Sequence, residues 1–556
     1  MRYKWQARPE ISGEHEYICA GLPQPVQELI RRRGLGRDFL DPDYSTLSQW
    51  EDLPGARAAV CVISESVARG DRILVHGDFD ADGITATATA LRVLRHLGAD
   101  VRHHLPCRFE EGYGLGEEGI RRCIDEGIDL LITADCGIGA VAQVHELRES
   151  GVRVVITDHH VPGDVLPDAD ALVNPLLSSE KSAPWMNLSG AGVIHTVLRG
   201  LFSGDLPEVM NPDLVAIGTI CDMVDLTGDN RILVSKGLSI ISRNPVPGVA
   251  ALIRETGSAD TRLSAVDIGF GIGPRINSAG RISHADTALE LLLQKDKRLA
   301  TDLARTLETS NGRRRELDSR VFSEAMEQLS GSAGPVGLAA SSDWHPGVIG
   351  ISASKISKKL NKPVILISWD GDTGRGSARG LPGMEVHTIL SSAMDEGLLE
   401  KFGGHSMAAG LTVSRARFPD FRDFIEERAA KLFDPSALPT LYIDGRLDPA
   451  ECSMELYDAL GVLEPFGQGN PEPVWMARGL FPGTYRTVGS DDRHLQVTFQ
   501  AGALTLRGIG FDMGSRTSEL NRPLDIAFKL KPDSWRGGSA VQLVIEDMKP
   551  AAERRS

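Results

Sequence analysis

Short apolar runs alternate with amphipathic stretches through the first half of the chain. The apolar runs have the character of buried strands, and they are residues 73–75, 129–133 and 152–156. Stretches with apolar residues at helical spacing follow them, at residues 85–97, 116–126 and 140–149. Strands that alternate with helices are typical of a parallel sheet covered by helices. We therefore predict an α/β domain over residues 51–284, preceded by an N-terminal segment at residues 1–50.

The pattern changes farther along the chain. Residues 285–330 carry leucines at roughly helical spacing and predict a connecting helical region. Two further apolar runs, residues 336–339 and 363–367, predict strands of a second α/β domain over residues 331–435. Beyond it, short strand-like runs between turn residues predict a small β barrel over residues 436–550.

Acidic residues follow the apolar runs of the first domain at matching places. The first run leads into His76-Gly77-Asp78-Phe79-Asp80-Ala81-Asp82-Gly83, the second into Asp135, the third into Asp158-His159-His160, and a fourth, residues 216–220, into Asp222. In open α/β sheets the functional site lies outside the carboxyl ends of the strands. Any one of these acids could be a solvated turn or a helix cap. Four strand ends that deliver Asp to one edge predict a shared site.

The types of side chain at this edge indicate a metal. Carboxylates with imidazoles suit hard or borderline ions such as Mn²⁺ or Mg²⁺. The 7 cysteines form no C-x-x-C pair, so a structural zinc site is unsupported. Five or six ligands exceed what one ion with open positions needs. Two ions that share a bridging carboxylate fit better, and that arrangement is typical of phosphoryl chemistry.

The second domain contains a glycine-rich stretch with two arginines, Thr373-Gly374-Arg375-Gly376-Ser377-Ala378-Arg379-Gly380. A loop of this kind exposes backbone N–H groups, and arginine can bind phosphate with two hydrogen bonds. Gly403-Gly404-His405 predicts a second flexible loop, with an imidazole. The alternative interpretation is a pair of ordinary glycine-rich hairpins with solvated arginines.

These motifs, in this order, resemble the DHH phosphoesterase superfamily and, within it, the RecJ-type exonucleases. The acids and the Asp-His-His sequence carry the resemblance, together with four further blocks: residues 108–115 (RFEEGYGL), 274–281 (PRINSAGR), 344–350 (WHPGVIG) with 403–405 (GGH), and 463–471 (LEPFGQGNP). The resemblance implies a parallel-sheet DHH domain, a long connecting helix, a DHH-associated α/β domain and a C-terminal OB-fold barrel. One departure is Asp225, an extra carboxylate after the fourth acid.

The resemblance also implies roles for individual residues. The two ions would have the ligands His76, Asp80 and Asp135 for one and Asp82, Asp135, His159 and Asp222 for the other. Asp78 and Asp158 would orient these ligands, and His160 would face a phosphate and complete the catalytic set. The residues expected to bind substrate are Arg108, Arg275, Asn277, Arg281, Ser377, Arg379, Gly403, Gly404 and His405.

The function implied by the resemblance is 5′→3′ degradation of single-stranded DNA to nucleoside 5′-monophosphates, in DNA repair and recombination. By the same resemblance, the partners would be single-stranded DNA, a single-strand-binding protein and a RecQ-type helicase, with the chain acting as a monomer. The net charge of −16 looks unfavourable for a nucleic-acid enzyme, but metal ions would offset many of the acids. We expect no membrane segment and, because the cysteines form no disulfide framework, a cytoplasmic location.

Three other functions remain open from the sequence. A related enzyme of the superfamily would cleave short oligonucleotides or cyclic dinucleotides. An inorganic pyrophosphatase would share the acids but would not need the barrel. A DNA-binding scaffold without catalysis would have lost some of the acids, whereas every expected ligand position is filled here.

Overall fold

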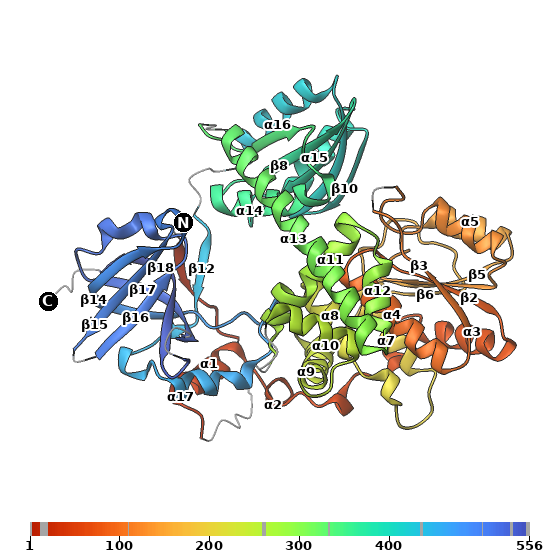
Figure 1. Cartoon of the computed structure of the whole chain (residues 1–556), viewed down its shortest axis with the longest axis horizontal. Coiled ribbons are helices and arrows are strands. Elements are labelled where there is room, and N and C mark those ends of the chain that lie inside the picture. Colours follow the sequence, from red (N-terminus) through yellow and green to blue (C-terminus); the bar gives the residue numbers. More distant parts are fainter. Residues whose placement is uncertain are drawn as a thin grey trace. The chain divides into compact units, whose positions relative to one another are not determined.

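The computed structural model describes residues 3–11, 21–108, 110–257, 263–331, 334–433, 438–502, 504–533 and 537–551. The chain forms two compact units (Figure 1). The first unit comprises Gly36–Gly312 and Val462–Glu472, and the second comprises Met1–Leu35, Arg313–Gly461 and Pro473–Ser556. Among the described residues, no helix has the length and apolar character needed to cross a membrane.

The first unit is built on a five-stranded parallel sheet, which confirms the predicted fold class. The strands are β2 (Arg72–His76), β3 (Asp100–His104), β4 (Leu130–Ala134), β5 (Arg153–Thr157) and β6 (Ala171–Val173). Their order in the sheet is β3-β2-β4-β5-β6, and every neighbouring pair is parallel. The chain leaves β2 toward β3 on one side and returns to β4 on the other. The strand order therefore reverses between β2 and β4.

Helices pack on both faces of this sheet, and further helices pack on those. The helices of the first unit are α2 (Arg37–Leu40), α3 (Ala56–Arg69), α4 (Ala81–His96), α5 (Glu117–Asp125), α6 (Val141–Glu149), α7 (Gly190–Arg199), α8 (Asp213–Asp222), α9 (Gly228–Arg243), α10 (Pro247–Thr256), α11 (Gly273–Ile282) and α12 (Asp286–Leu293). Alternate residues of each strand point to opposite faces. Ile73 and Val75 pack in the core with α4 and α7, whereas Leu74 packs with α5 and α6.

One predicted strand is wrong. The apolar run 216–220 lies inside helix α8, which is buried from Asp213 to Thr219 and packs against α4, α7 and α9. An element that is apolar on all sides shows no periodicity, so a short buried helix and a buried strand look alike in sequence. Asp222 is the last residue of this helix and approaches the sheet edge from outside the sheet.

The region expected to connect the domains contains a long helix. A π-helical segment, η5 (Asp267–Ile272), runs directly into α11, and α12 is followed by α13 (Lys297–Gln328). Short 3-10 turns complete the first unit, at Tyr44–Thr46, Trp50–Asp52, Pro175–Leu177 and Glu208–Met210.

The second unit contains a mixed sheet with the order β10-β11-β9-β8-β7. Its elements are β7 (Gly337–Ser341), α14 (Pro346–Leu360), β8 (Val364–Asp370), β9 (Thr373–Arg379), α15 (Val386–Asp395), β10 (Lys401–His405), β11 (Ala408–Ser414) and α16 (Phe418–Leu432). The expected strands after residue 335 are confirmed as β7 and β8, which pair in parallel. The two glycine-rich stretches are strands β9 and β10, so the prediction that they are loops is wrong. Hydrogen bonds to β8 and β11 already occupy the backbone N–H groups of β9, which the sequence analysis expected to be exposed in a loop.

The C-terminal part of this unit is a closed barrel, as expected. Its strands are β13 (Gly445–Arg446), β14 (Trp475–Val488), β15 (His494–Ala501), β16 (Leu504–Gly510), β17 (Leu524–Pro532) and β18 (Val541–Pro550). It also contains helix α17 (Met454–Ala459) and turns Pro449–Glu451, Ser490–Asp492 and Gly514–Glu519, whereas the turn Leu460–Leu463 leads into residues 462–472. Pairing of β14 with β17 closes the barrel. The N-terminal α1 (Gln24–Arg33) and β1 (Lys4–Ala7) belong to this unit, and β1 pairs in parallel with β12 (Thr440–Ile443).

Residues 462–472 belong to the first unit although the barrel follows them in sequence. The buried Arg231 of α9 donates to the carbonyl oxygens of Glu464 (2.8 Å), Pro465 (3.4 Å) and Phe39 (2.7 Å), and its guanidinium lies 3.7 Å from the Phe39 ring centre. Leu226 N–H donates to the Gln468 carbonyl at 2.8 Å. This segment therefore packs on the loop that follows Asp222.

We expect Arg231→Ala to lower the free energy of unfolding by about 3 kcal/mol, because it leaves buried carbonyl groups without a donor. Hydrogen exchange of peptides from residues 462–472 should accelerate at the same time. Arg243→Ala, at the exposed end of the same helix, is the matched control and should change stability by less than about 0.5 kcal/mol. Equal exchange rates in the two variants would contradict this role of Arg231.

Candidate metal centre

The acids gather where the strand order of the first unit reverses. Asp78, Asp80 and Asp82 follow β2, and Asp135 follows β4, the two strands between which the order changes. At such a point the connections from the two strands leave in opposite directions, so the edge between them is open to a ligand. Asp158, His159 and His160 follow the next strand, β5. The prediction that these strand ends meet is confirmed, with α8 contributing Asp222.

Asp80 begins helix α4. Its carboxylate accepts hydrogen bonds from the backbone N–H groups of Asp82 (2.9 Å) and Gly83 (3.1 Å). Asn277 of α11 accepts from Ala81 N–H at 2.9 Å and fixes the same turn from outside. A Cβ on Gly83 would lie 2.6 Å from the Asp78 backbone nitrogen and Cβ, so only glycine allows the turn to close over Asp78.

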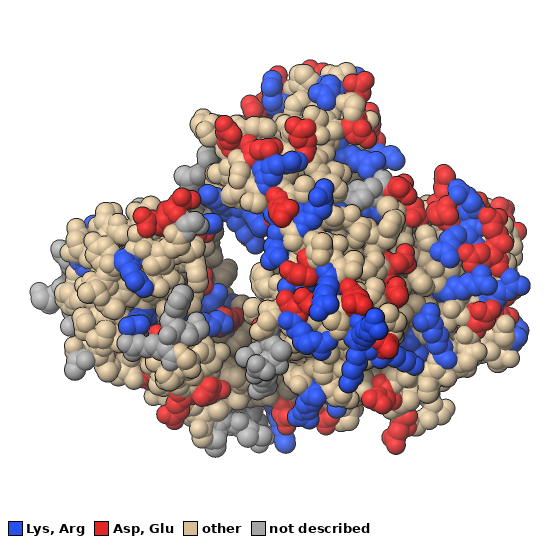
Figure 2. Space-filling view, in the orientation of Figure 1, with Lys and Arg blue, Asp and Glu red and all other residues tan. Residues whose placement is uncertain are grey.

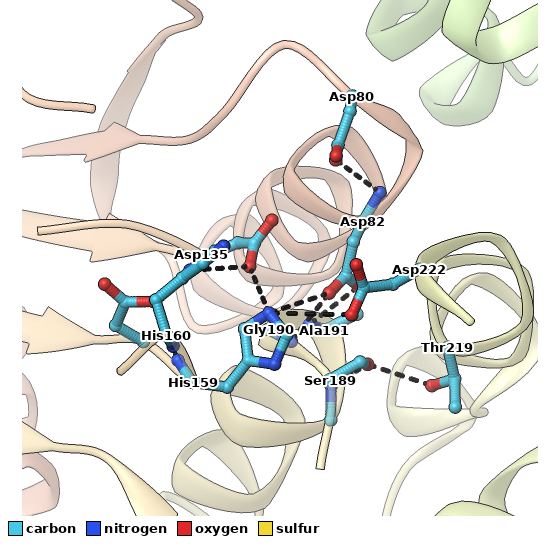
Figure 3. Close-up of polar contacts among 12 residues, drawn as sticks. Asp80, Asp82, Asp135, His159, His160, Ser189, Gly190, Ala191, Thr219 and Asp222 are labelled. Atoms are coloured by element: carbon cyan, nitrogen blue, oxygen red, sulfur yellow. Dashed lines mark hydrogen bonds and ion pairs between the residues drawn. The ribbon is translucent and has the colours of Figure 1, made fainter. Parts of the chain in front are cut away.

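The carboxylate of Asp82 lies at the N-terminus of α7. It accepts from Gly190 N–H at 2.7 Å and from Ala191 N–H at 3.1 Å, which places it at the positive end of the helix (Figure 3). A Cβ on Gly190 would overlap Asp135. The sequence analysis did not identify this helix end. The run Ser189-Gly190-Ala191-Gly192, an N-cap followed by small residues, was the available signal.

His159 lies among three carboxylates from different elements. Its Nε2 is 3.1 Å from Asp135 Oδ1, 3.6 Å from Asp222 Oδ2 and 4.0 Å from Asp82 Oδ2 (Figure 3). Asp135 has a backbone φ of +67°, in the left-handed region that non-glycine residues rarely adopt. Such strain persists where the surrounding structure imposes it, commonly at functional sites.

Asp158 holds both histidines in place. One of its carboxylate oxygens accepts from the backbone N–H groups of His159 (2.7 Å) and His160 (3.1 Å) and is 2.7 Å from His160 Nδ1. The other accepts from Ile138 N–H at 2.9 Å. Burial lowers the pKa of His160, but the hydrogen bond to Asp158 and its charge outweigh burial and raise that pKa to about 9. The Tyr113 hydroxyl lies 2.9 Å from the same nitrogen.

The electrostatics of the cluster fit a multivalent cation. Burial, followed by the charges of neighbouring aspartates, raises the pKa values of Asp78, Asp82 and Asp135 well above their usual range, and that of Asp222 to about 6. Oδ1 of Asp78 is buried and has no hydrogen-bond partner among the described residues. Oxygen and imidazole donors that repel one another in this way are what Mn²⁺ or Mg²⁺ would stabilise.

The donor atoms fall into overlapping groups whose members lie within 4.8 Å of one another. These groups are Asp82 with His159 and Asp222, Asp78 with Asp80 and Asp135, and Asp135 with His159 and His160. Asp135 and His159 each belong to two of these groups, and of the two only Asp135, a carboxylate, has the two oxygens that a bridging ligand uses. The sequence analysis expected His76 to bind one ion together with Asp80 and Asp135, and expected Asp78 only to orient ligands. In the structure it is Asp78 that lies with Asp80 and Asp135.

His76 faces away from the other candidate ligands in this structure. Its Nε2 lies 3.2 Å from the Gly114 carbonyl oxygen, and its Nδ1 faces Gly119 of α5. The alternation of a strand places His76 on the same face as Leu74, toward α5. Burial and nearby His104 lower the pKa of His76 to about 3, so the ring is neutral. His76 is in none of the groups of candidate ligands among the described residues, and its expected role as a ligand stays a prediction.

The arginines expected to bind substrate differ in their surroundings. Arg108 lies beside Asp78 and Asp80, with its guanidinium 4.9 Å from the Phe79 ring centre. Arg275 is buried, pairs with Glu308 at 2.7 Å, and donates to the carbonyls of Gly271 and Glu255. Its guanidinium is thus already engaged, and its expected contact with a phosphate stays a prediction. Arg281 lies one helical turn after Asn277 on α11.

In the second unit, the expected substrate residues share one face of the sheet. The strand register aligns Ser377 with Gly410 and Gly403, and Arg379 with Ala408 and His405. Side chains two residues apart point the same way, so the side chains of Ser377, Arg379 and His405 rise from one face. Small residues between them leave the surface open, and Gly403, Gly404, His405 and Gly410 are exposed.

In the first unit, the extra carboxylate Asp225 that follows the fourth acid faces Asn187 and Gly469.

Comparisons with known proteins agree with this arrangement. The DHH family N-terminal domain matches residues 72–219, the DHHA1 domain residues 333–431, and the RecJ OB domain residues 443–547. The single-stranded-DNA-specific exonuclease RecJ of Salmonella typhimurium is 36% identical over 583 residues, which cover 99% of this chain and 100% of that protein. This chain belongs to the RecJ family.

Solved structures support the same conclusion. The structure of Thermus thermophilus RecJ in complex with Mn²⁺ matches with a TM-score of 0.85 and 32% identity, over 99% of this chain and 80% of that chain. The structure of the same protein in complex with Mg²⁺ matches with a TM-score of 0.81 and 31% identity, over 99% of this chain and 79% of that chain.

A feature of this RecJ-family chain that sequence analysis missed is the anchor of the loop that carries Tyr113. One oxygen of Glu111 accepts from Cys107 N–H at 2.7 Å, and the other lies 2.8 Å from His104 Nε2. Arg122 of α5 lies 3.1 Å from the second ring nitrogen of His104. Phe109, within this loop, lies outside the described residues. Glu111 therefore links the loop to β3 and α5.

We expect Asp135→Asn to reduce hydrolysis of a 5′-labelled single strand by more than about 100-fold, since even residues that only orient a ligand cost 10–100-fold. In EDTA, however, the variant should melt at a higher temperature than the wild type. Burial and neighbouring acids raise the pKa of Asp135, so the wild type loses stability as pH rises and this carboxyl ionises in the folded state. The stabilisation by Asp135→Asn should therefore be larger at pH 8 than at pH 4.

Asp164→Asn removes an exposed carboxylate of the same unit and serves as the control, with wild-type activity and melting expected. Addition of Mn²⁺ should raise the melting temperature of the control but raise that of Asp135→Asn much less. An Asp135→Asn protein that gains as much stability from Mn²⁺ as the control would show that Asp135 is not part of a metal centre.

We expect Glu111→Ala to lower kcat/KM on single strands by about 10–100-fold, because the loop with Tyr113 loses its anchor beside His160. Glu111→Gln retains an oxygen that can accept from Cys107 N–H and should recover part of the activity. Glu110→Ala changes the exposed neighbour in the same loop and should behave as wild type. If Glu111→Ala and Glu110→Ala have the same kcat/KM, the anchor has no role in activity.

Proposed function

We propose that this RecJ-family chain is a metal-dependent exonuclease that degrades single-stranded DNA from its 5′ end and releases nucleoside 5′-monophosphates, in DNA repair and recombination. The observation that carries the proposal is the convergence of Asp78, Asp80, Asp82, Asp135, His159 and Asp222 at the switch point of the sheet. A match to the RecJ OB domain over residues 443–547 favours a polymeric substrate over pyrophosphate or a dinucleotide.

Two divalent ions, Mn²⁺ or Mg²⁺, would bind at this centre. Asp82, Asp135, His159 and Asp222 would hold one of them, and Asp78, Asp80 and Asp135 the other. When bound, such ions lower the pKa of water and neutralise the charge that develops on a phosphodiester during in-line displacement. The structures of Thermus thermophilus RecJ in complex with Mn²⁺ and with Mg²⁺ support this choice of ions.

The remaining residues of the centre would orient the scissile phosphate. Asp158 fixes the ring of His160, and its hydrogen bond and charge raise the pKa of this imidazole, which favours the protonated form. A protonated His160 can donate a hydrogen bond to a phosphate oxygen. Arg108, beside Asp78 and Asp80, would neutralise a further phosphate of the strand. Attack of water on the scissile phosphorus breaks its bond to the 3′ oxygen, which takes up a proton. The terminal nucleotide leaves with its own 5′ phosphate, and the cleaved phosphate stays on the next nucleotide.

The terminal 5′ phosphate would bind on the sheet face of the second unit that carries Ser377, Arg379 and His405, where β10 is exposed and α14 packs against β9. Arg379 donates to Ser377 Oγ at 2.9 Å, which orients its guanidinium along the strand. A Cβ on Gly350 would lie 2.8 Å from Arg379 Nη2, so a glycine in α14 allows this arginine to lie against the helix. The first turn of α14 is a positive helix end, and together with Arg379 it favours an anion.

The barrel would hold the strand beyond the cleaved nucleotide, as OB folds do through cationic and aromatic contacts. On the face shown in Figure 2, basic and acidic side chains are interspersed. With a net charge of −16, the chain must depend on specific phosphate contacts rather than a general basic surface.

Family resemblance supports a single-strand-binding protein and a RecQ-type helicase as partners of a monomer. The six described cysteines are free thiols, which supports a cytoplasmic location.

The direct test is digestion of a 5′-labelled single strand and the matching duplex in Mn²⁺. A labelled mononucleotide as the first product from the single strand, with little product from the duplex, is the expected result. A labelled oligonucleotide as the first product, or equal rates on both substrates, would reject the proposal.

We expect Arg379→Ala to raise KM for a 5′-phosphorylated single strand by about tenfold, because a charge-assisted hydrogen bond to phosphate is lost. Stabilisation of the protein by Mn²⁺ should be unchanged. Arg422→Ala removes an exposed arginine from α16, which covers the opposite face of the same sheet, and should leave KM unaltered. If KM on strands with and without a 5′ phosphate responds equally to Arg379→Ala, this arginine does not recognise the terminal phosphate.

A further inference from the structure

Three large apolar side chains are exposed where η5 meets the end of α8. The exposed fractions are 82% for Phe270, 72% for Met223 and 53% for Val266. Single exposed apolar residues are common on protein surfaces and need no explanation. Here Met223 directly follows Asp222, and Val266 and Phe270 lie in the segment packed on the same helix end. The apolar surface therefore adjoins the candidate metal centre.

The geometry of η5 determines the direction of Phe270. Ile268 and Ile272 are buried in the core of the first unit, so the residue between them in the turn, Phe270, points to solvent. Gly269 and Gly273 form the side of the turn that meets α8. A Cβ on Gly269 would lie 3.6 Å from Ile220, and one on Gly273 would overlap Cys221. Phe270 thus emerges beside the last turn of the helix that carries Asp222.

This turn is held firmly although its apolar side chain faces water. Arg275 donates to the Gly271 carbonyl at 2.7 Å and to the Glu255 carbonyl at 3.0 Å, and pairs with Glu308. The carboxylate of Asp267 accepts from both the N–H and the hydroxyl of Ser264. π-helical turns are frequent at functional sites. An aromatic side chain on a firmly held backbone turn, next to the proposed phosphodiester-cleaving centre, has a natural occupant in a nucleobase.

We propose that Phe270 is a stacking platform for one nucleobase of the substrate strand, with Met223 and Val266 forming the apolar border of that subsite. The proposal rests on the proposed single-strand exonuclease function. Every nucleobase has a flat aromatic face, so stacking on Phe270 would tolerate any sequence. Both faces of a base within a duplex are already covered by its neighbours. A subsite of this kind therefore favours single strands.

The first experiment measures binding of a fluorescent single strand whose linkages are phosphorothioates, which slows hydrolysis. Phe270→Ala should weaken binding about tenfold, within the range expected for loss of one stacked base. Phe270→Trp should bind as tightly as the wild type or more tightly. Phe270→Leu keeps an apolar side chain but has no aromatic face, and should resemble Phe270→Ala. Leu299→Ala removes another exposed apolar side chain of the first unit and should have no effect.

The second experiment identifies the base. Strands with a single abasic position, moved along the sequence, should show one position at which the wild type loses affinity. Phe270→Ala should lose nothing further at that position, because both changes remove the same contact. Independent losses at every position would overturn the stacking proposal.

Binding by the wild type and by Phe270→Ala separates failure of the proposed function from failure of the subsite. If the wild type does not bind or cleave single strands, the proposed function is wrong. If the wild type binds and Phe270→Ala binds equally well, the proposed function stands and the subsite does not. The apolar surface would then serve contact with protein rather than DNA.

Discussion

Mutual repulsion of buried aspartates is the constraint on which the first unit of this RecJ-family chain depends. Asp78, Asp82 and Asp135 are each at most 3% exposed and lie close to Asp80 and Asp222. Burial and proximity both disfavour ionisation, as the raised pKa values of these carboxyls show. A folded chain keeps such a cluster where the backbone imposes it, and either protonation or a bound cation relieves the repulsion.

The backbone imposes the cluster through small residues and helix ends. Gly83, Gly190 and Gly218 occupy positions where a Cβ would overlap Asp78, Asp135 or Asp82. The N-terminus of α7 stabilises the carboxylate of Asp82, and Asp80 caps α4. Asp135 adopts a left-handed backbone conformation to direct its side chain to the same point. Ligand geometry is therefore set before any ion binds, which is how a site gains affinity and selectivity.

Links between distant segments stabilise each of the two units. Arg231 holds residues 462–472 next to the loop that follows Asp222, within the first unit. In the second unit, Arg8 and Arg33 from the N-terminal segment both pair with the buried Asp444, at 2.6 Å and 2.8 Å. The N-terminal segment and the C-terminal barrel thus belong to one folded structure. A truncation that removes the barrel together with Asp444 would leave two arginines without their carboxylate partner.

The sequence by itself determined the parallel sheet, the order of the domains and the list of acids. Strand–helix alternation and acids at strand ends are local patterns, and the carboxyl ends of parallel strands necessarily meet at one edge. Tertiary structure decided what no local pattern encodes. It made residues 216–220 a buried helix, turned His76 toward α5, engaged Arg275 with carbonyl groups, and made the glycine-rich stretches strands. These outcomes depend on partners outside the local segment, such as Gly114 for His76, Glu255 for Arg275 and β11 for β9. Such partners are defined only once the chain has folded.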